Sequence, residues 1–295
     1  MYKIVRIFSF VFFLGTLLSF SQITLGYNLK KGKVFNIKQT AHQVMVQNMG
    51  GTSHEITNDL EGIYEFKVMA ADQNGYQIML QFKDFALKSS SSIQGTLMDV
   101  RASKPIEGDI VSNMFSALIG HEMKMQINKQ GKILSIEGGD ELVEKMINSV
   151  PSVDDFTKNI MKKSLEKEFS SDGLARSFEQ MTYFYPNEPK NPGDTWQTEF
   201  SGKVNAVNQW KLEKVEANMM SISGNADVTI KSAEQALTLS LTGHQETLIQ
   251  ASTNDGFIIK MMVSGKNEGK SIMTQNNMEI PTTLDQTITY ELITE

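Results

Sequence analysis

Apolar and polar side chains alternate with period two over much of the chain. In the N-terminal half the alternation covers residues 64–68 and 76–82, and Asn74-Gly75, a strong hairpin signal, lies between them. Because successive side chains of a strand point to opposite faces, this pattern predicts an antiparallel hairpin with one buried face and one wet face.

The same pattern predicts strands in both halves of the chain. Further strands are expected at 34–46, 123–127 and 133–136, and then at 196–200, 204–215, 226–230, 237–241, 257–263 and 284–292. The polar stretch 89–92 is expected to be a loop, and Asn191-Pro192-Gly193-Asp194 has the sequence of a type II turn. The segment 204–215 would extend about 40 Å at ~3.3 Å per residue, a length typical of strongly coiled or barrel-like sheets.

Between the two strand-rich halves, apolar residues recur with helical spacing. A helix is expected at 109–119, and three more are expected within the block 139–185. Ser152 followed by Asp155 resembles a capping box, and Ser171-Asp172 is expected to cap the last helix. Each helix has one apolar stripe to bury, as does each sheet. The predicted fold class is therefore mainly β with α (α+β), a curved antiparallel sheet or unclosed barrel with a helical lid.

The first 21 residues are expected to be a secretory signal peptide. Lys3 and Arg6 precede an apolar run at 7–18, and Ser19-Phe20-Ser21 is a small-residue cleavage signal. A membrane anchor is the alternative, but a span needs about 20 apolar residues and this run is shorter. The protein is thus expected to be exported, periplasmic or extracellular, and not lipid-anchored, because it has no cysteine to acylate.

The rest of the chain is long enough to bury a large core. We divide it into an N-terminal β-rich half (22–138), the helical block (139–185) and a C-terminal β-rich half (186–295), and we expect 22–295 to form one continuous domain.

Charge and cysteine content exclude several classes of protein. The formal net charge is −6, and this acidic balance argues against nucleic acid as a partner, since phosphate binding needs a basic patch. The absence of cysteine excludes disulfides, thiolate catalysis and zinc–thiolate sites. No cofactor is expected.

Candidates for catalysis are few. The four histidines, His42, His54, His121 and His244, include no pair at the spacing that places two ligands on one face of a strand or helix, so no metal site is expected. Ser164-Leu165-Glu166-Lys167 matches the Ser-x-x-Lys pattern of serine acyl-enzymes, but it lies on the charged face of a predicted helix and lacks the companion motifs. We therefore predict no catalytic residue and no enzymatic activity.

Methionine is unusually frequent, with 18 residues. Its unbranched thioether adapts to ligands of varied shape, although ordinary gap-filling in a core explains the same count. The predicted ligand-binding residues lie on the helical lid, and they are Met114, Leu118, Phe156, Ile160, Phe178 and Met181.

Two short motifs resemble a known family. A proline-rich segment leads into Gly193-Asp194-Thr195-Trp196 after the helical block, and Tyr27-Asn28-Leu29-Lys30-Lys31-Gly32 follows the cleavage signal. These motifs resemble a family of exported proteins of unknown function common in Bacteroidota, and the resemblance implies no catalytic residue. In architecture alone, the layout is similar to periplasmic lipoprotein-carrier folds, which are unclosed barrels with a helical lid over a cavity for acyl chains. That is an analogy of fold and not of function.

Three functions remain open at this point. The first is a non-enzymatic binding or carrier module of the cell envelope, with a lipid or another amphipathic small molecule as its partner and transient contact with the envelope. The second is an envelope structural or protein-interaction protein with a filled core. The third is a hydrolase, for which the sequence indicates no substrate. The space between the helices and the sheet distinguishes the first function from the second.

Overall fold

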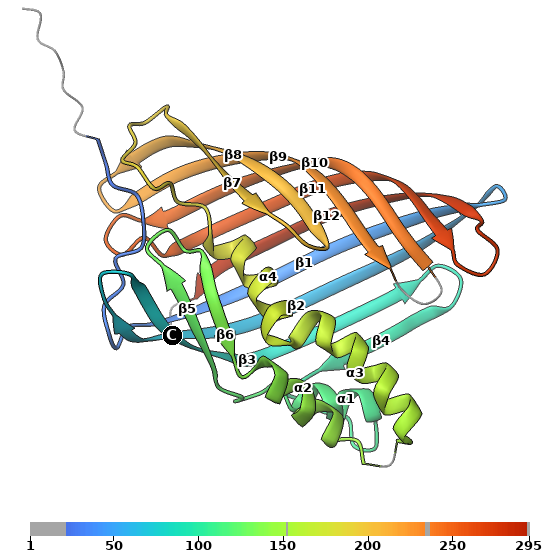
Figure 1. Ribbon diagram of the computed structural model, residues 1–295. Coiled ribbons are helices and arrows are strands. Elements are labelled where there is room, and N and C mark those ends of the chain that lie inside the picture. The colour runs from blue at the N-terminus through green and yellow to red at the C-terminus, as the bar shows by residue number, and fades with distance from the viewer. Residues whose placement is uncertain (1–21, 152, 234–236, 294–295) are drawn as a thin grey trace, which may run out of the picture.

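The computed structural model describes residues 22–151, 153–233 and 237–293, so the predicted signal peptide at 1–21 lies outside the described residues. Within these ranges the chain forms one 12-stranded sheet, and every strand pairing in it is antiparallel (Figure 1). The strands are β1 Val34–Met49, β2 Thr52–Ala71, β3 Gly75–Ser91, β4 Gly95–Arg101, β5 Met123–Asn128, β6 Ile133–Glu137, β7 Thr195–Phe200, β8 Val204–Glu216, β9 Met219–Ala233, β10 Leu237–Ser252, β11 Ile258–Met273 and β12 Glu279–Ile293.

The order of the strands joins the two ends of the chain. It runs β6-β5-β3-β2-β1-β12-β11-β10-β9-β8-β7, and β4 pairs with β3 off this path. The first strand therefore lies beside the last one, and both strand-rich halves contribute to the same sheet. In the described part of the chain, β6 and β7 are the two ends of the order and do not pair with each other, so the sheet is not closed. This confirms the predicted unclosed antiparallel sheet.

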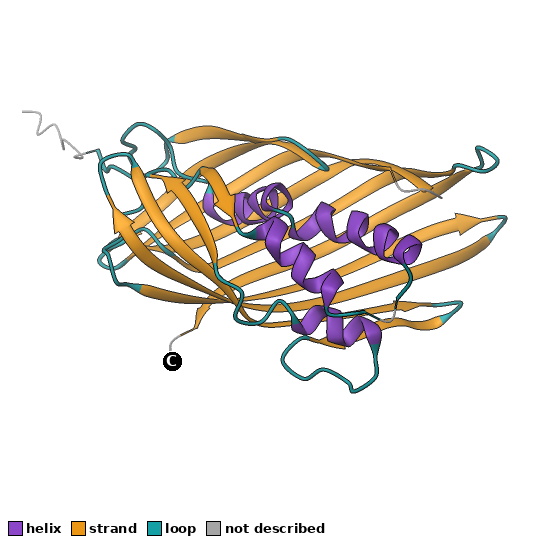
Figure 2. Cartoon of the chain, turned by 60° about the horizontal axis from the view of Figure 1, so that its bottom comes forward, coloured by secondary structure: helices purple, strands orange, loops and turns teal. Residues whose placement is uncertain are grey.

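Four helices of the described residues lie on one side of this sheet, and they cover only part of it (Figure 2). Their bounds are α1 Ile110–Ser116, α2 Gly139–Asn148, α3 Asp155–Phe169 and α4 Ser171–Thr182. No described helix combines the length and apolar character that crossing a bilayer requires. We call the face of the sheet that carries the helices the concave face and the opposite one the convex face.

Side-chain caps start three of the helices. The carboxylates of Asp109 and Asp154 accept hydrogen bonds from the third residue beyond them, as expected for N-caps. Ser170 caps α4, and its Oγ accepts from the amide of Gly173 at 3.1 Å. The predicted cap at Ser171 was therefore wrong by one residue. Ser152 lies outside the described residues, and Asp154 is the cap that follows it.

Aromatic rings join the helices to the sheet. The ring of Phe178 on α4 lies 5.1 Å from that of Tyr64 and 5.8 Å from that of Phe66, both on β2. Phe169, the last residue of α3, contacts Phe82 and Phe85 of β3 at 6.3 and 6.0 Å. We call these six residues the covered region. Five of them belong to the main hydrophobic core and Phe169 packs against it, so this part of the concave face is filled by protein side chains.

Two further local predictions were wrong. Most of the polar stretch 89–92 is strand and not loop, because β3 continues to Ser91 and pairs there with β2 and β4. Phe156 and Ile160, predicted to face the sheet, are 76% and 40% exposed. The reason is that α3 packs on α2, through contacts that include the ion pair of Lys162 with Glu144, and the start of its apolar stripe is left at the surface.

Candidate ligand-binding site

Register assigns every side chain of the sheet to one face. Residues directly opposite on neighbouring strands share a face, and successive residues alternate between faces. At concave-face positions of the described parts of β1–β3 and β7–β12 there is no aspartate, glutamate, lysine or arginine. The charged residues of these strands, such as Glu61, Asp227, Lys266 and Asp285, all belong to the convex face. The side chains at these concave-face positions are therefore either apolar or polar, and none of them is a carboxylate, an ammonium or a guanidinium group.

One row of positions that crosses nine strands on this face is mostly polar. In register, its members are Ser89, Asn58, Gln43, Gln286, Gly265, Gln245, Ala226, Asn208 and Thr198. We call this set the amide row. Seven of the nine carry an uncharged hydroxyl or carboxamide, and the other two are the small residues glycine and alanine.

Mostly apolar rows lie on both sides of the amide row. On the side toward the covered region the row is Leu60, Ala41, Ile288, Val263, Thr247, Gly224, Trp210 and Trp196. On the far side it is Ile56, Met45, Leu284, Asn267, Gly243, Val228, Ala206 and Phe200. Several members of the far row form a second hydrophobic cluster, separate from the main core. An uncharged polar stripe between two apolar stripes suits a molecule that is apolar with a neutral polar group.

Hydrogen bonding along the amide row is incomplete. Gln43 Nε2 donates to Gln286 Oε1 at 3.3 Å, and Thr198 Oγ1 accepts from Trp210 Nε1 at 2.8 Å. Asn208 is 2% exposed, yet its Nδ2 has no acceptor in the described part of the protein. A buried donor without a partner costs roughly 1–3 kcal/mol, so such groups call for an explanation.

Asn208 lines a small cavity between α4 and the curled sheet. Its walls come from β7 and β8 on one side, from β10, β11 and β12 on the other, and from Gln180 of α4, and its volume is about 20 Å³. A cavity needs about 10–15 Å³ to hold one water, so this one accommodates a single water and no acyl chain. A larger ligand requires α4 to move away from the sheet.

Two buried tyrosines, Tyr290 in the wall of this cavity and Tyr64, are held neutral. Tyr64 Oη donates to Gln39 Oε1 at 2.7 Å, and Gln39 Nε2 donates to Tyr290 Oη at 3.5 Å. Burial raises the pKa of both phenols well above the ordinary value of about 10. These groups therefore add polar atoms to the concave face without adding charge.

The residues predicted from the sequence fall into two sets. Met114, Leu118, Phe178 and Met181 come together in the main core, with exposed fractions of 0–6%. Phe156 and Ile160 lie apart from them at the surface. Gln180 is the α4 residue that lines the cavity, and the sequence pattern missed it because a glutamine on a helix reads as solvent-facing. The predicted role of the six residues in ligand binding remains a prediction.

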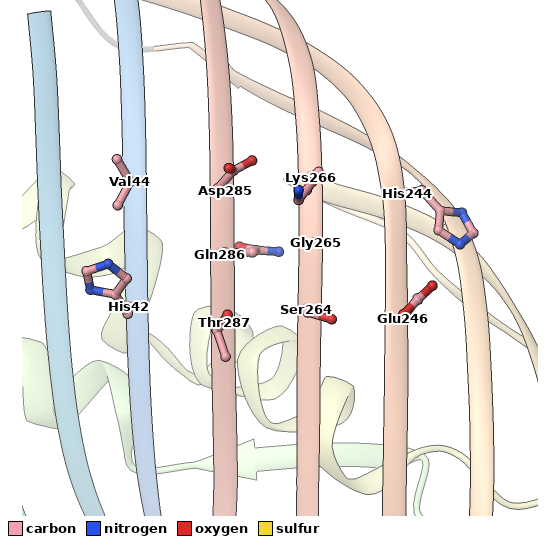
Figure 3. A pocket seen from close by; sticks show the side chains of 10 residues that line it. All are labelled: His42, Val44, His244, Glu246, Ser264, Gly265, Lys266, Asp285, Gln286 and Thr287. Atoms are coloured by element: carbon pink, nitrogen blue, oxygen red, sulfur yellow. The ribbon is translucent and has the colours of Figure 1, made fainter.

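The convex face has a polar hollow of its own. Figure 3 shows it with the helices behind the strands, between His42 of β1 and His244 of β10, and its volume is about 420 Å³. Short side chains on the two strands between them, including Ser264 and Thr287, leave the space. Each imidazole lies near a carboxylate, His42 at 2.7 Å from Asp59 and His244 at 3.5 Å from an aspartate of β9.

Sequence spacing could not reveal this hollow, because strand register brings together histidines that are far apart along the chain. Among the described residues, no three histidine or carboxylate side chains are grouped closely enough to hold a metal ion. The hollow is charged and open where the concave face is uncharged.

Comparison with known proteins gives one family and one informative fold. The model of a family of unknown function (DUF6263) matches residues 73–258, which is more than half of the chain. No curated protein matches the sequence. Among solved structures, a lipovitellin structure described for its lipid–protein interactions is 12% identical, with a TM-score of 0.54 over 90% of this chain and 25% of that one. The chain thus spans about a quarter of the length of lipovitellin, and the likeness concerns the fold.

Two further structures match more weakly. DynF from the dynemicin biosynthesis pathway of Micromonospora chersina is 4% identical, with a TM-score of 0.25 over 91% of this chain and 88% of that one. An outer membrane channel from Pseudomonas putida F1 is 6% identical, with a TM-score of 0.26 over 90% of this chain and 97% of that one.

Proposed function

The chain belongs to this family of unknown function (DUF6263), and we propose that it is a non-enzymatic binding or carrier module for an amphipathic, lipid-like ligand. The observation that carries the proposal is the concave face of nine strands, which holds no aspartate, glutamate, lysine or arginine at its described positions. Moving an unpaired ionised group from water into such a surface is very costly, whereas apolar chains gain from the transfer. The charged head of a ligand would therefore stay outside while its uncharged part enters.

The fold of lipovitellin supports the same assignment at a coarse level. That protein was described for its lipid–protein interactions, and it shares this sheet architecture at a TM-score of 0.54. The support is an analogy of fold, and the residue-level support comes from the concave face itself.

Helix α4 is the movable wall in this proposal. It contacts the sheet through Phe178, and its Gln180 borders the 20 Å³ cavity. Pockets for drug-sized ligands typically measure about 300–1,000 Å³, so binding requires α4 to separate from β7 and β8. The ligand would replace contacts that α4 makes with the sheet.

Export to the periplasm or the cell exterior is part of the proposal. Its support is the apolar run at 7–18 after two basic residues, which is typical of a secretory signal peptide. A carrier in that compartment would meet lipids at a membrane surface.

A structural or protein-interaction role is the second candidate. The small cavity favours it, because a filled core needs no ligand. The 76% exposure of Phe156 also favours it, since exposed aromatic side chains are frequent at protein contacts.

Native mass spectrometry with a monomeric, short-chain lysophosphatidylcholine tests the proposal. The expected result is a one-to-one adduct that survives gentle ionisation, and a lipid retained from the producing cells would support the same conclusion. A clean mass without adduct over the whole titration would overturn the carrier function in favour of the second candidate.

Two matched variants locate the adduct on the sheet. Gln245→Glu places a carboxylate in the amide row, and we expect it to weaken binding at least about tenfold. Gln250→Glu makes the same chemical change on the convex face of the same strand, where the side chain is exposed, and we expect binding to be unchanged. Equal effects of the two variants would contradict a concave site.

A further inference from the structure

The amide row is not only uncharged but also carries hydrogen-bond donors. Its carboxamide groups can each donate two hydrogen bonds, and one of these donors, Asn208 Nδ2, is buried and lacks an acceptor in the described part of the protein. We infer that the row recognises the uncharged acyl carbonyl, ester or amide, that joins the apolar chain of the ligand to the rest of it. This inference rests on the proposed function and names the group that the same site reads.

The direction of hydrogen bonding favours a carbonyl. An ester or amide carbonyl oxygen accepts hydrogen bonds and bears no formal charge, so it complements a free N–H donor. A carboxylate or phosphate also accepts, but stable burial of its charge needs a cation, and the concave-face positions of the described strands β1–β3 and β7–β12 hold no lysine or arginine. A plain hydrocarbon would leave Asn208 Nδ2 without its hydrogen bond.

The position of the donor also fits. In an acyl lipid the carbonyl marks the boundary between the hydrocarbon chain and the polar part. The amide row lies between two mostly apolar rows, and Asn208 itself lies between Trp210 and Ala206 on the concave face of β8. An acyl chain that crosses either apolar row along the strand direction would bring its carbonyl to the amide row.

The donor is at the cavity that the ligand enters in this proposal. Asn208 lines the cavity that Gln180 of α4 closes, together with Gln245 from the opposite wall. Separation of α4 from the sheet would therefore open the space directly in front of Asn208 Nδ2. Two carboxamides on facing walls would then flank a bound carbonyl.

Comparison of an ester lipid with its ether analogue tests the inference. The two probes are a short-chain lysophosphatidylcholine and the ether-linked molecule of equal chain length, which lacks only the carbonyl oxygen. Titration of the unmodified protein, followed by isothermal calorimetry, is expected to show about tenfold tighter binding of the ester, the effect of one hydrogen bond to an otherwise unpaired buried donor. A neutral N-acyl amide with the same chain shows whether a lipid ester or an acylated protein is the better source, and tighter binding of either one than of the ether supports carbonyl recognition.

Substitution of Asn208 assigns the effect to its donor. Asn208→Leu keeps the branching and the number of heavy atoms of the side chain and removes Nδ2. We expect the affinity for the ester to fall to that for the ether, while the affinity for the ether stays the same. Asn225→Leu, on the exposed convex face of the neighbouring strand β9, is the matched control and should leave the preference intact.

The outcomes separate this inference from the proposed function. Equal affinity of the unmodified protein for the ester and the ether would overturn carbonyl recognition and leave the carrier function standing. Failure of all three probes to bind would overturn the carrier function itself. An ester preference that persists in Asn208→Leu would contradict the role given to Asn208.

Discussion

The covered region and the amide row lie on the same face of the same sheet, yet their side chains differ sharply. On β2, Tyr64 and Phe66 are 4% and 1% exposed beneath Phe178, whereas Asn58, on the same face of the same strand, is half-buried in the amide row. Large apolar rings lie beneath the helices, whereas neutral amides such as Asn58 lie farther along the same strands, where α4 borders the amide row through Gln180. The strand pattern alone does not require this change.

This difference indicates a division of labour along the concave face. Under the helices, burial of large rings contributes stability, because each fully buried side chain of this kind is worth about 1.5–3 kcal/mol. Along the amide row, hydrogen-bonding side chains without full partners contribute less to stability and remain available to another molecule. Variants that act on one region and not on the other test this division.

The largest effect is expected in the covered region. Phe178→Ala removes the ring that joins α4 to β2, and we expect it to lower the free energy of unfolding by about 3–5 kcal/mol in urea titrations. Phe156→Ala is the matched control on α3, and because that ring is 76% exposed, we expect a change within about 0.5 kcal/mol. Similar losses for the two phenylalanines would mean that α4 is not the element that fixes the helices to the sheet.

An intermediate effect is expected where α2 meets the start of α4. A Cβ added at Gly139 would lie 2.4 Å from the backbone nitrogen of Ser171, too close without movement of one helix. We expect Gly139→Ala to destabilise the protein by about 1–3 kcal/mol through overpacking, and to speed ligand entry by loosening α4.

Two measurements check the destabilisation expected for Gly139→Ala. Alanine is intrinsically better than glycine in a helix by about 1 kcal/mol, so a gain in the melting temperature of Gly139→Ala would show that the contact is not tight. Lys145→Ala, an exposed change on the same helix, should change stability by no more than about 0.5 kcal/mol.

The smallest effect concerns the pH dependence of the α4 contact. Glu179 on α4 accepts a hydrogen bond from the amide of Ile133 on β6, and partial burial raises the pKa of its carboxyl above the ordinary value of 4.5, more than that hydrogen bond and nearby Lys132 lower it. Because the pKa of Glu179 is higher in the folded protein than in the unfolded chain, its contribution to folding stability is fully present below pH 4.5. That contribution is lost as the pH rises through the folded-state pKa.

We therefore expect the unmodified protein to lose a small amount of stability as the pH rises from 4.5 through the folded-state pKa of Glu179. The loss should be well below about 1 kcal/mol, because the side chain is only half-buried and solvent screens it. Glu179→Gln should remove this part of the pH dependence in urea titrations followed by circular dichroism. An unchanged slope in the variant would assign the pH dependence to other groups.

Local sequence patterns predict much of the fold. The alternation at residues 64–68 and 76–82 became the β2–β3 hairpin, and the turn expected at residues 191–194 has Gly193 at φ +95° with the amide of Asp194 donating to the carbonyl of Asn191. These features depend on neighbours in sequence, so a single chain suffices to predict them.

The candidate site depends on distant neighbours and could not be predicted in the same way. Gln43 and Gln286 are 243 residues apart, and only the register between β1 and β12 places their amides in one row. Phe156 belongs to an apolar helical stripe, but its burial depends on where α3 packs, which periodicity does not encode. The convex hollow between His42 and His244 likewise follows from register across β12 and β11.

Quenching of tryptophan fluorescence by brominated acyl chains tests the central claim most directly. The chain has two tryptophans, Trp196 and Trp210, which pair with each other on the concave face next to the amide row. Bromine quenches only by close approach, so the unmodified protein reports on this face without substitution. We predict saturable quenching by a lysophospholipid brominated along its chain, reversed by the unbrominated lipid. Binding of that lipid, seen by calorimetry, without any quenching would place it away from the concave face and contradict the account.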